Sequence, residues 1–257
     1  MCMLLGFSGD RKYRLTSLLR KFFENGHTQP HGWGMAIYGA DEQSDEPFVA
    51  KEPSPAHESA YLGALLEKGV VARMAIAHVR LASKGSVSIA NTHPFVKRAN
   101  GTDWVLAHNG TLPDYAFRWD LSVSGGTDSE KILAEIVRFV GKDSGPARIK
   151  RVEAALETMS PYGKLNLIFT DGEKMYVFSN RENTLFSVNV YGSVIIATEP
   201  VAIKSPDGEF EWNPVPLRTL LVYKNGKLEW SGKQVGDFKR LWKPHFEWEE
   251  IEGLARW

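Results

Sequence analysis

The order of hydrophobic patterns along the chain limits its fold more than any other feature. Apolar runs of strand length and two short helical segments come first, two longer helical segments follow, and short strands return from Lys164 onward. Hairpin signals such as Asp171-Gly172 and Asn225-Gly226 join the later strands, whereas a parallel sheet would need strict alternation of strand and helix. The chain is therefore predicted to be an α+β protein with antiparallel sheets covered by helices.

Two of the predicted strands are strongly apolar, and each ends in polar residues. The run over 70–79 leads into Arg80, and the run over 104–107 leads into Asn109-Gly110. The remaining strands are expected over 2–6, 35–38, 48–50, 165–169, 175–178, 185–190, 194–197, 220–223 and 228–230, and helices over 15–23, 56–67, 125–140 and 147–159. A turn at residues 7–10 is expected to end the first of these strands. Sites are commonly built where such strands end and helices begin.

The composition indicates an ordinary globular protein with a full core. Of 257 residues, 43% are hydrophobic, and no linker or repeat divides the chain, so a single domain over residues 2–257 is expected. Basic and acidic residues number 31 each, which gives no basic field for nucleic acid or membrane partners. Because no apolar run approaches the roughly 18 residues of a membrane span, a cytoplasmic location is expected. The aromatic, acidic tail, about 240–257, is expected to pack on the body or against another subunit of a homo-oligomer.

The only cysteine, Cys2, lies where removal of Met1 would expose it at the N-terminus. A free α-amine has a reference pKa of about 7.7–8.0 and can accept the thiol proton, so one residue would carry both nucleophile and base. A chain that keeps Met1 would have this amine locked in an amide, and we expect the working protein to begin at Cys2. The alternative is that a lone cysteine near a terminus is a small buried hydrophobe. A single cysteine excludes intrachain disulfides and cysteine-based zinc sites.

Several polar residues at element ends each have a structural explanation. Arg80 could be an ion-pair partner, and Asn109-Gly110 could form a type I′ hairpin turn. Asp128 could be a favourable acid in the first turn of a helix whose Thr127 and Glu130 form a capping box. Taken singly, each explanation is at least as good as a functional one.

Taken together, the same residues have a common chemical purpose. An amino-acid head group needs a fork of donors for its carboxylate and an anion for its ammonium, which Arg80 and Asp128 provide. An acyl-transfer site also needs donors for a developing oxyanion, which the Asn109 amide and the Gly110 N–H can supply. The set therefore indicates acyl transfer on an amino-acid substrate.

Five motifs that hold these residues follow one another along the chain. They are the N-terminal Cys2, His-Val-Arg-Leu-Ala-Ser at 78–83, Asn-Thr-His-Pro-Phe at 91–95, His-Asn-Gly at 108–110 and Thr-Asp-Ser-Glu at 127–130. In this order they resemble the class II glutamine amidotransferase domain of the N-terminal-nucleophile hydrolases. The His-Gly-Trp-Gly at 31–34 is similar to a form seen in the stand-alone, YafJ-like group. The resemblance covers most of the chain, and five ordered motifs are far more specific than any one of them.

The resemblance implies a four-layer αββα sandwich of two mainly antiparallel sheets and hydrolysis of a γ-glutamyl amide. The Cys2 sulfur would attack the γ-carboxamide carbon of glutamine, with Asn109 and the Gly110 N–H stabilising the oxyanion. The Cys2 amine would protonate the departing ammonia and later activate the water that cleaves the thioester.

The resemblance also assigns the rest of the pocket. Arg80 would bind the substrate α-carboxylate and Asp128 its α-ammonium, while Ser83 and His93 would line the site. No metal and no organic cofactor is implied.

Three functions remain open from the sequence. No sugar-phosphate isomerase or phosphoribosyl transferase domain is visible after these motifs, so the nitrogen from a glutaminase reaction would pass to a separate partner protein or leave. The second function is hydrolysis of a γ-glutamyl amide other than glutamine. The third is a catalytically silent binding or regulatory module, against which stands the presence of the nucleophile, both oxyanion donors and both head-group residues.

Overall fold

The computed structural model describes residues 2–39, 46–82, 85–118, 121, 123–206 and 208–236, so Met1, Ser83 and the predicted tail at about 240–257 lie outside the described residues. The helices and strands, in chain order, are β1 (Met3–Arg14), α1 (Thr16–Phe23), β2 (Trp33–Tyr38), β3 (Phe48–Glu52), α2 (Ala60–Lys68), β4 (Val71–Val79), β5 (Phe95–Ala99), β6 (Thr102–Thr111), α3 (Asp128–Val140), α4 (Gly145–Met159), β7 (Lys164–Thr170), β8 (Met175–Ser179), β9 (Phe186–Val190), β10 (Ser193–Ala197), β11 (Lys204–Ser205), β12 (Gly208–Glu209), β13 (Asn213–Pro214), β14 (Leu221–Lys224) and β15 (Lys227–Ser231). Short 3₁₀ segments are η1 (Glu24–His27), η2 (Ala56–Glu58), η3 (Ile89–Asn91), η4 (Asp114–Ala116) and η5 (Ser160–Tyr162).

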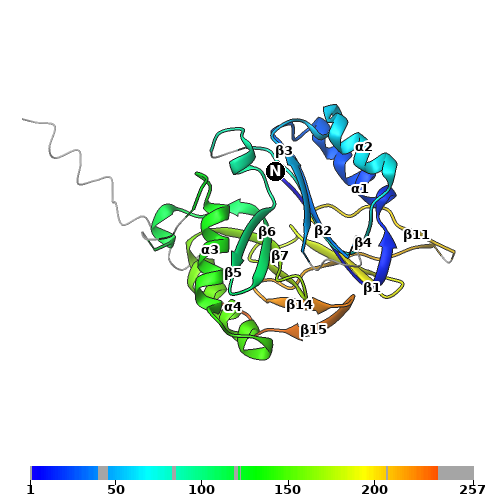
Figure 1. The fold of residues 1–257 in the computed structure, drawn as a ribbon. Coiled ribbons are helices and arrows are strands. Elements are labelled where there is room, and N and C mark those ends of the chain that lie inside the picture. Colours follow the sequence, from blue (N-terminus) through cyan, green and yellow to red (C-terminus); the bar gives the residue numbers. More distant parts are fainter. Residues whose placement is uncertain are drawn as a thin grey trace, which may run out of the picture.

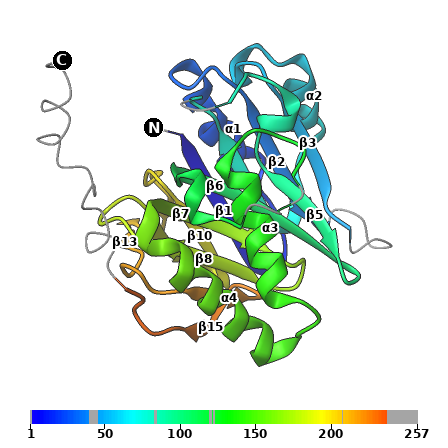
Figure 2. The ribbon, with the colours of Figure 1, turned by 90° about the vertical axis from the view of Figure 1, so that its left-hand side faces the viewer.

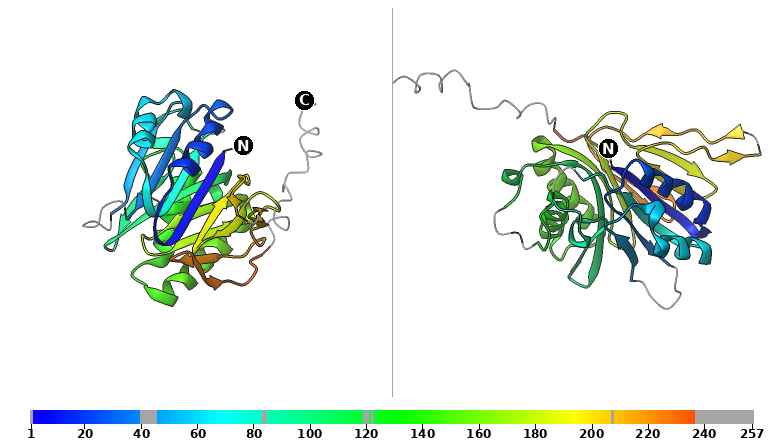
Figure 3. Two further views of the ribbon diagram at one scale, coloured as in Figure 1. Left: turned by 90° about the vertical axis from the view of Figure 1, so that its right-hand side faces the viewer. Right: turned by 90° about the horizontal axis from the view of Figure 1, so that it is seen from above.

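Two large antiparallel sheets lie face to face (Figure 1). The seven-stranded sheet has the order β13-β9-β10-β1-β4-β2-β3, and the six-stranded sheet has the order β15-β14-β8-β7-β6-β5. The hairpin of β11 and β12 extends away from the body (Figure 3). Neighbouring strands in both sheets run antiparallel, which confirms the expected pairing.

Three hydrophobic clusters separate the layers and produce the order helix, sheet, sheet, helix. The cluster between the sheets contains Leu4 and Ile76 from the first sheet and Val105 and Ile168 from the second. A second cluster packs α1 and α2 on the outer face of the first sheet, and a third packs α3 and α4 on the second (Figure 2). Because a fully buried aliphatic side chain contributes about 1.5–3 kcal/mol, these clusters are the main source of stability. The expected αββα sandwich is confirmed.

Strand β1 lies inside the first sheet and faces two layers at once. Its side chains alternate, so that Met3 and Leu5 pack under the helices while Leu4 points between the sheets. A side chain at Gly6 would come within 2.9 Å of Ile168, which explains the glycine where the sheets approach each other. The prediction of a turn at residues 7–10 is wrong, because β1 continues to Arg14 through an irregularity in its register with β4.

The predicted helix over 56–67 is divided at Ser59. Residues before it form η2, and α2 begins after it, because the Ser59 hydroxyl caps the helix by accepting a hydrogen bond of 2.9 Å from the Leu62 N–H. No helix among the described residues is long and apolar enough to cross a membrane.

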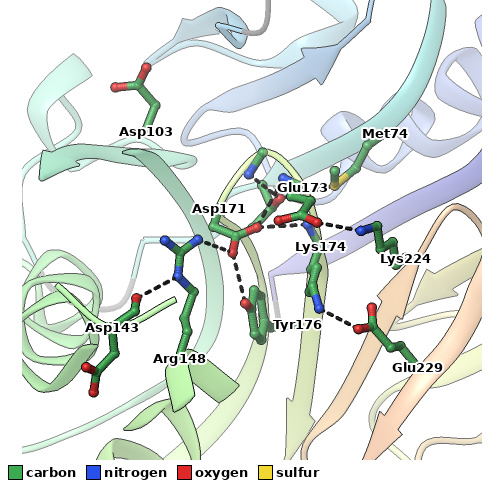
Figure 4. Close-up of polar contacts among 12 residues, drawn as sticks. Met74, Asp103, Asp143, Arg148, Asp171, Glu173, Lys174, Tyr176, Lys224 and Glu229 are labelled. Carbon is green, nitrogen blue, oxygen red and sulfur yellow. Dashed lines mark hydrogen bonds and ion pairs between the residues drawn. The ribbon is translucent and has the colours of Figure 1, made fainter. Parts of the chain in front are cut away.

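Polar contacts close the end of the sandwich that lies away from Cys2 (Figure 4). The buried Asp171, in the turn after β7, accepts hydrogen bonds from Arg148 at 2.7 Å and from the Tyr176 hydroxyl at 2.9 Å. Lys174 and Lys224 pair with Glu229 and Glu173, each at 2.5 Å. These contacts anchor the strands at this end of the sandwich.

Candidate active site

Cys2 precedes β1 at the point where β4 ends beside it. Met3 pairs with Val79, so the chain after β4 runs alongside the cysteine. The Leu81 N–H donates to the Cys2 sulfur at 3.2 Å, and the thiol donates to the Leu81 carbonyl at 3.3 Å. Burial raises the pKa of the Cys2 thiol, while the Leu81 N–H and the charge of Arg80 act in the opposite direction. The sulfur is therefore held in place but needs a base to become a thiolate near neutral pH.

Arg80 follows β4 and is positioned by the segment before β2. Its N–H donates to the Gly32 carbonyl at 2.7 Å, and its carbonyl accepts from the His31 N–H at 3.0 Å. The His31 ring nitrogen Nδ1 accepts from the Ala82 N–H at 2.9 Å. The guanidinium donates to the Ser86 carbonyl at 3.0 Å, and this bond holds the loop that follows. The His-Gly-Trp-Gly segment thus fixes the backbone on both sides of Arg80.

Asn109-Gly110 lies within β6 and not in a turn. Asn109 pairs with Asn166 and Gly110 with Leu165 of β7, so the hairpin interpretation is wrong. A side chain at Gly110 would lie 1.8 Å from the Lys164 carbonyl oxygen, so close packing of β7 requires glycine there.

The Asn109 side chain crosses from the second sheet to the nucleophile. Its Nδ2 donates to the Cys2 carbonyl at 2.6 Å. Because an amide nitrogen carries two hydrogens, one remains for a second acceptor in front of Cys2. The strand pair β6 and β7 therefore presents an amide donor beside the cysteine.

Asp128 is the first residue of α3, and its carboxylate accepts from the Leu112 N–H at 2.6 Å. The capping-box interpretation is wrong. Thr127 makes no side-chain cap, and Glu130 accepts instead from the N–H groups of Ser124 and Gly125, at 2.7 and 2.6 Å. The Thr127 hydroxyl is buried, and within the described part of the chain it has no hydrogen-bond partner. Asp128 therefore connects the start of α3 to the chain just after β6.

His93 is buried, and its nearest titratable neighbours are the buried His78 and His108. Its ring lies 4.0 Å from that of His78, centroid to centroid, and His108 bonds Ser129 at 3.0 Å. Burial, together with the neighbouring histidines, lowers the pKa of His93 well below its usual range, and burial lowers the pKa of His78 to about 3. Both rings are therefore neutral near pH 7.

A lysine and a glycine position the segment that carries His93. Lys51 Nζ donates to the carbonyl oxygens of Thr92 and Pro94, at 2.8 and 3.2 Å. A side chain at Gly34 would lie 2.1 Å from the His93 carbonyl oxygen, so this segment packs directly on β2. The buried His93 is thus held against β2 by its backbone neighbours.

The structure brings the expected residues to one end of the sandwich. Cys2 contacts Asn109 directly and is adjacent to Arg80 through Leu81. Asp128 joins them through Leu112, and a side chain at Gly85, in the loop held by Arg80, would lie 3.3 Å from Thr127. Ser83 lies outside the described residues.

Sequence reasoning missed the backbone of Leu81 and the hydroxyl of Thr127. Leu81 acts through main-chain groups, which carry no sequence signal, whereas Thr127 was interpreted as a cap. In the part of the chain that the structure describes, no group of three His, Cys, Asp or Glu side chains is arranged to hold a metal ion. The chemistry available is that of a thiol, amide donors, a guanidinium and a carboxylate.

Known proteins resemble this chain in both sequence and fold. The model of the family described as class-II glutamine amidotransferases matches residues 1–192. The chain is 28% identical over 270 residues to an uncharacterized protein of Methanocaldococcus jannaschii, covering 93% of this chain and 74% of that protein. It is 29% identical over 192 residues to the putative glutamine amidotransferase YafJ of Escherichia coli K12, covering 69% and 72%. The solved glutamine phosphoribosylpyrophosphate amidotransferase of B. subtilis has the same fold, with a TM-score of 0.69 at 17% identity over 92% of this chain and 50% of that one.

Proposed function

Since this chain belongs to the class-II glutamine amidotransferases, we propose that it hydrolyses the γ-carboxamide of glutamine through a thioester on Cys2. The contact that best supports this proposal is the 2.6 Å hydrogen bond from Asn109 to the Cys2 carbonyl. It holds an amide donor from one sheet beside a thiol carried by the other. An acyl-transfer site needs this pairing of nucleophile and oxyanion donor.

The proposed reaction has two halves. The Cys2 sulfur attacks the γ-carbonyl carbon while its proton passes to the α-amine, and the oxyanion accepts from Asn109 Nδ2 and the Gly110 N–H. The carbon–nitrogen bond then breaks, the α-amine returns the proton to the nitrogen, and ammonia leaves. Water attacks the thioester in the second half, which releases glutamate and restores the thiol.

The glutamate part of the substrate is bound on the β4 side of the nucleophile. The Arg80 guanidinium forms the fork for the α-carboxylate, and the Asp128 carboxylate accepts from the α-ammonium. Ser83 and His93 complete the wall of this pocket. The acceptor of the ammonia is a separate partner protein, or the ammonia is released to solvent.

The α-amine can act only when Met1 has been removed, because an amide nitrogen does not accept a proton near neutral pH. The burial that raises the pKa of the Cys2 thiol makes this base necessary. The working form in this proposal therefore begins at Cys2.

Glutamate release from glutamine by the purified chain tests the proposal. The wild-type protein should produce glutamate and ammonia in equal amounts, and Cys2→Ala should produce neither. If the wild-type protein, with Met1 removed, binds glutamine but releases no glutamate, it is a silent binding module and the proposal fails.

A further inference from the structure

Arg80 and Asp128, the two residues proposed to bind the substrate head group, come from different parts of the fold. Arg80 follows β4 of the first sheet, whereas Asp128 begins α3, which packs on the second sheet. In glutamine, however, the α-carboxylate and the α-ammonium are attached to the same carbon atom. A binding site has to hold its groups within about 0.5 Å of the productive geometry. The distance between Arg80 and Asp128 therefore needs to be fixed by the structure around them.

The side chain of Asn91 connects the two segments that carry these residues. Asn91 is buried, and its Nδ2 donates to the carbonyl and hydroxyl oxygens of Ser86, both at 3.2 Å. The same Ser86 carbonyl accepts from the Arg80 guanidinium at 3.0 Å. On its other side, Asn91 Oδ1 accepts from the Gly126 N–H at 3.0 Å. Gly126 precedes Asp128 by two residues, so one buried amide links both head-group segments.

The orientation of this amide is fixed by its partners. The Ser86 carbonyl can only accept a hydrogen bond, and the Gly126 N–H can only donate one. The Asn91 nitrogen therefore faces the loop after Arg80, and its oxygen faces the turn before α3. A carboxylate at position 91 would keep the acceptor for Gly126 and would place an anion against the Ser86 carbonyl. The two bonds can thus be separated by a change of similar size.

Glycines allow both segments to approach Asn91 closely. A side chain at Gly125 would lie 2.8 Å from Asn91 Oδ1 and also 2.8 Å from the Ala90 carbonyl oxygen. A side chain at Gly85 would lie 3.1 Å from Asn91 Nδ2 and 3.3 Å from the Thr127 methyl group. The loop and the turn are therefore packed against each other around this one amide.

Glu130 holds the same turn in a different way. It accepts from the N–H groups of Ser124 and Gly125, at 2.7 and 2.6 Å. Because Glu130 belongs to α3 itself, these bonds shape the turn without connecting it to the loop after Arg80. Asn91 supplies a connection between them.

We propose that Asn91 is a positioning residue that sets the spacing between Arg80 and Asp128, and that it thereby makes the site selective for substrates with both an α-carboxylate and an α-ammonium. This inference rests on the proposed function and deepens it at the same site. Asn91 acts through its two neighbours and takes no part in the chemistry at Cys2. Loss of its amide should therefore raise KM more than it lowers kcat.

Two substrates separate the head-group spacing from general damage. They are glutamine and 4-carbamoylbutanoate, which keeps the carboxamide and the carboxylate but has no α-amine. The wild type should prefer glutamine, because the analogue leaves the Asp128 carboxylate without its cation. In Asn91→Ala, kcat/KM for glutamine should fall about 10- to 100-fold, since a displacement of about 1 Å in a bound substrate can cost this much. The value for the analogue should change little, because binding by Arg80 alone does not depend on the spacing.

Two further variants approach the same contact differently. Asn91→Asp keeps the acceptor for Gly126 and loses the donor to Ser86, so it should also lower the preference for glutamine, chiefly through KM. Gly125→Ala alters no polar side chain and pushes the turn away from Asn91. It should lower the preference in the same direction.

Asn180→Ala is the matched control. Asn180 is also buried and links backbone groups through its amide. It accepts from the Leu165 N–H at 2.8 Å and donates to the Gly163 carbonyl at 2.7 Å. This variant should lose stability and keep the preference of the wild type.

The outcomes distinguish this inference from the proposed function. If the wild type hydrolyses neither amide, the thioester chemistry is wrong, and the same comparison is made on the binding of glutamate and glutarate, which need no reaction. A wild type without preference in either assay would overturn the inference together with the assignment of Asp128. Equal losses for both substrates in Asn91→Ala, or a preference that stays as in the wild type, would overturn the role of Asn91 alone.

Discussion

Replacing Asn109 by alanine removes two interactions, and their effects can be measured separately. The first is the 2.6 Å hydrogen bond to the Cys2 carbonyl, which is present before substrate binds. The second is the donor proposed for the oxyanion, which matters only during the reaction. Stability and turnover should therefore respond to Asn109→Ala by different amounts.

The stability loss follows from the hydrogen bond. A typical bond contributes about 0.5–1.5 kcal/mol net, and an acceptor left unsatisfied in a buried place costs about 1–3 kcal/mol. Cys2 is only partly buried, so its carbonyl can regain water, and a loss of about 1–2 kcal/mol in the free energy of unfolding is expected. Urea unfolding measures this value.

The loss in turnover should be larger. Removal of one oxyanion donor typically lowers kcat by a factor of about 10²–10³. The assay is glutamate release at saturating glutamine, at a temperature where the variant is fully folded. Asn166→Ala is the matched control, because Asn166 lies opposite Asn109 on β7 but bonds Thr184 instead of Cys2. This control should lose stability and keep kcat. If Asn109→Ala keeps kcat as well, Asn109 is only a structural link between the sheets.

Three further variants test other parts of the account. Arg80→Lys should raise KM about 10- to 100-fold, because an ammonium cannot replace a bidentate fork to a carboxylate; a normal kcat/KM in the folded variant would reduce Arg80 to a structural role. His78→Phe should make the free energy of unfolding less dependent on pH. Burial lowers the pKa of His78 to about 3 in the folded protein, so below pH 6.5 only the unfolded chain binds a proton at this residue. The stability linked to the neutral ring is therefore present above pH 6.5 and is lost as the pH falls toward 3. The slope of unfolding free energy between pH 6 and 4 should decrease by about 1.4 kcal/mol per pH unit, and an unchanged slope would mean that His78 titrates normally in the folded protein. Asp171→Ala should cost about 3–5 kcal/mol in urea unfolding, because it strips Arg148 of its buried partner; a loss below 1 kcal/mol would mean that water replaces Asp171.

The strands and helices were predictable from sequence because they depend on hydrophobic periodicity, whereas their four-layer arrangement was inferred from the resemblance to a known family. The apolar runs at 70–79 and 104–107 became β4 and β6, and the helical spacing over 147–159 became α4. Predictions based on local polar signals were less reliable. The polar residues after Phe7 suggested a turn, but pairing with β4 continues the strand through an irregularity that no local pattern encodes.

The turn propensity of Asn109-Gly110 also suggested a structure that the chain does not adopt. An Asn-Gly pair favours a hairpin, yet here the glycine is required by the approach of the Lys164 carbonyl from another part of the chain. The ordered motifs predicted that Cys2, Arg80 and Asp128 belong to one site, because the motifs lie where strands and helices begin or end. They could not indicate that Leu81 holds the Cys2 sulfur, because this contact depends on the register of β1 with β4.

The central claim is that Cys2 acts with its own free α-amine, and intact mass combined with turnover tests it most directly. Two homogeneous samples are needed, one that retains Met1 and one lighter by a single methionine. The account predicts that only the lighter sample hydrolyses glutamine and forms a thioester on Cys2. Its activity should rise with pH as the amine loses its proton, around a pKa of roughly 7–8. Full activity in the sample that retains Met1 would contradict the mechanism.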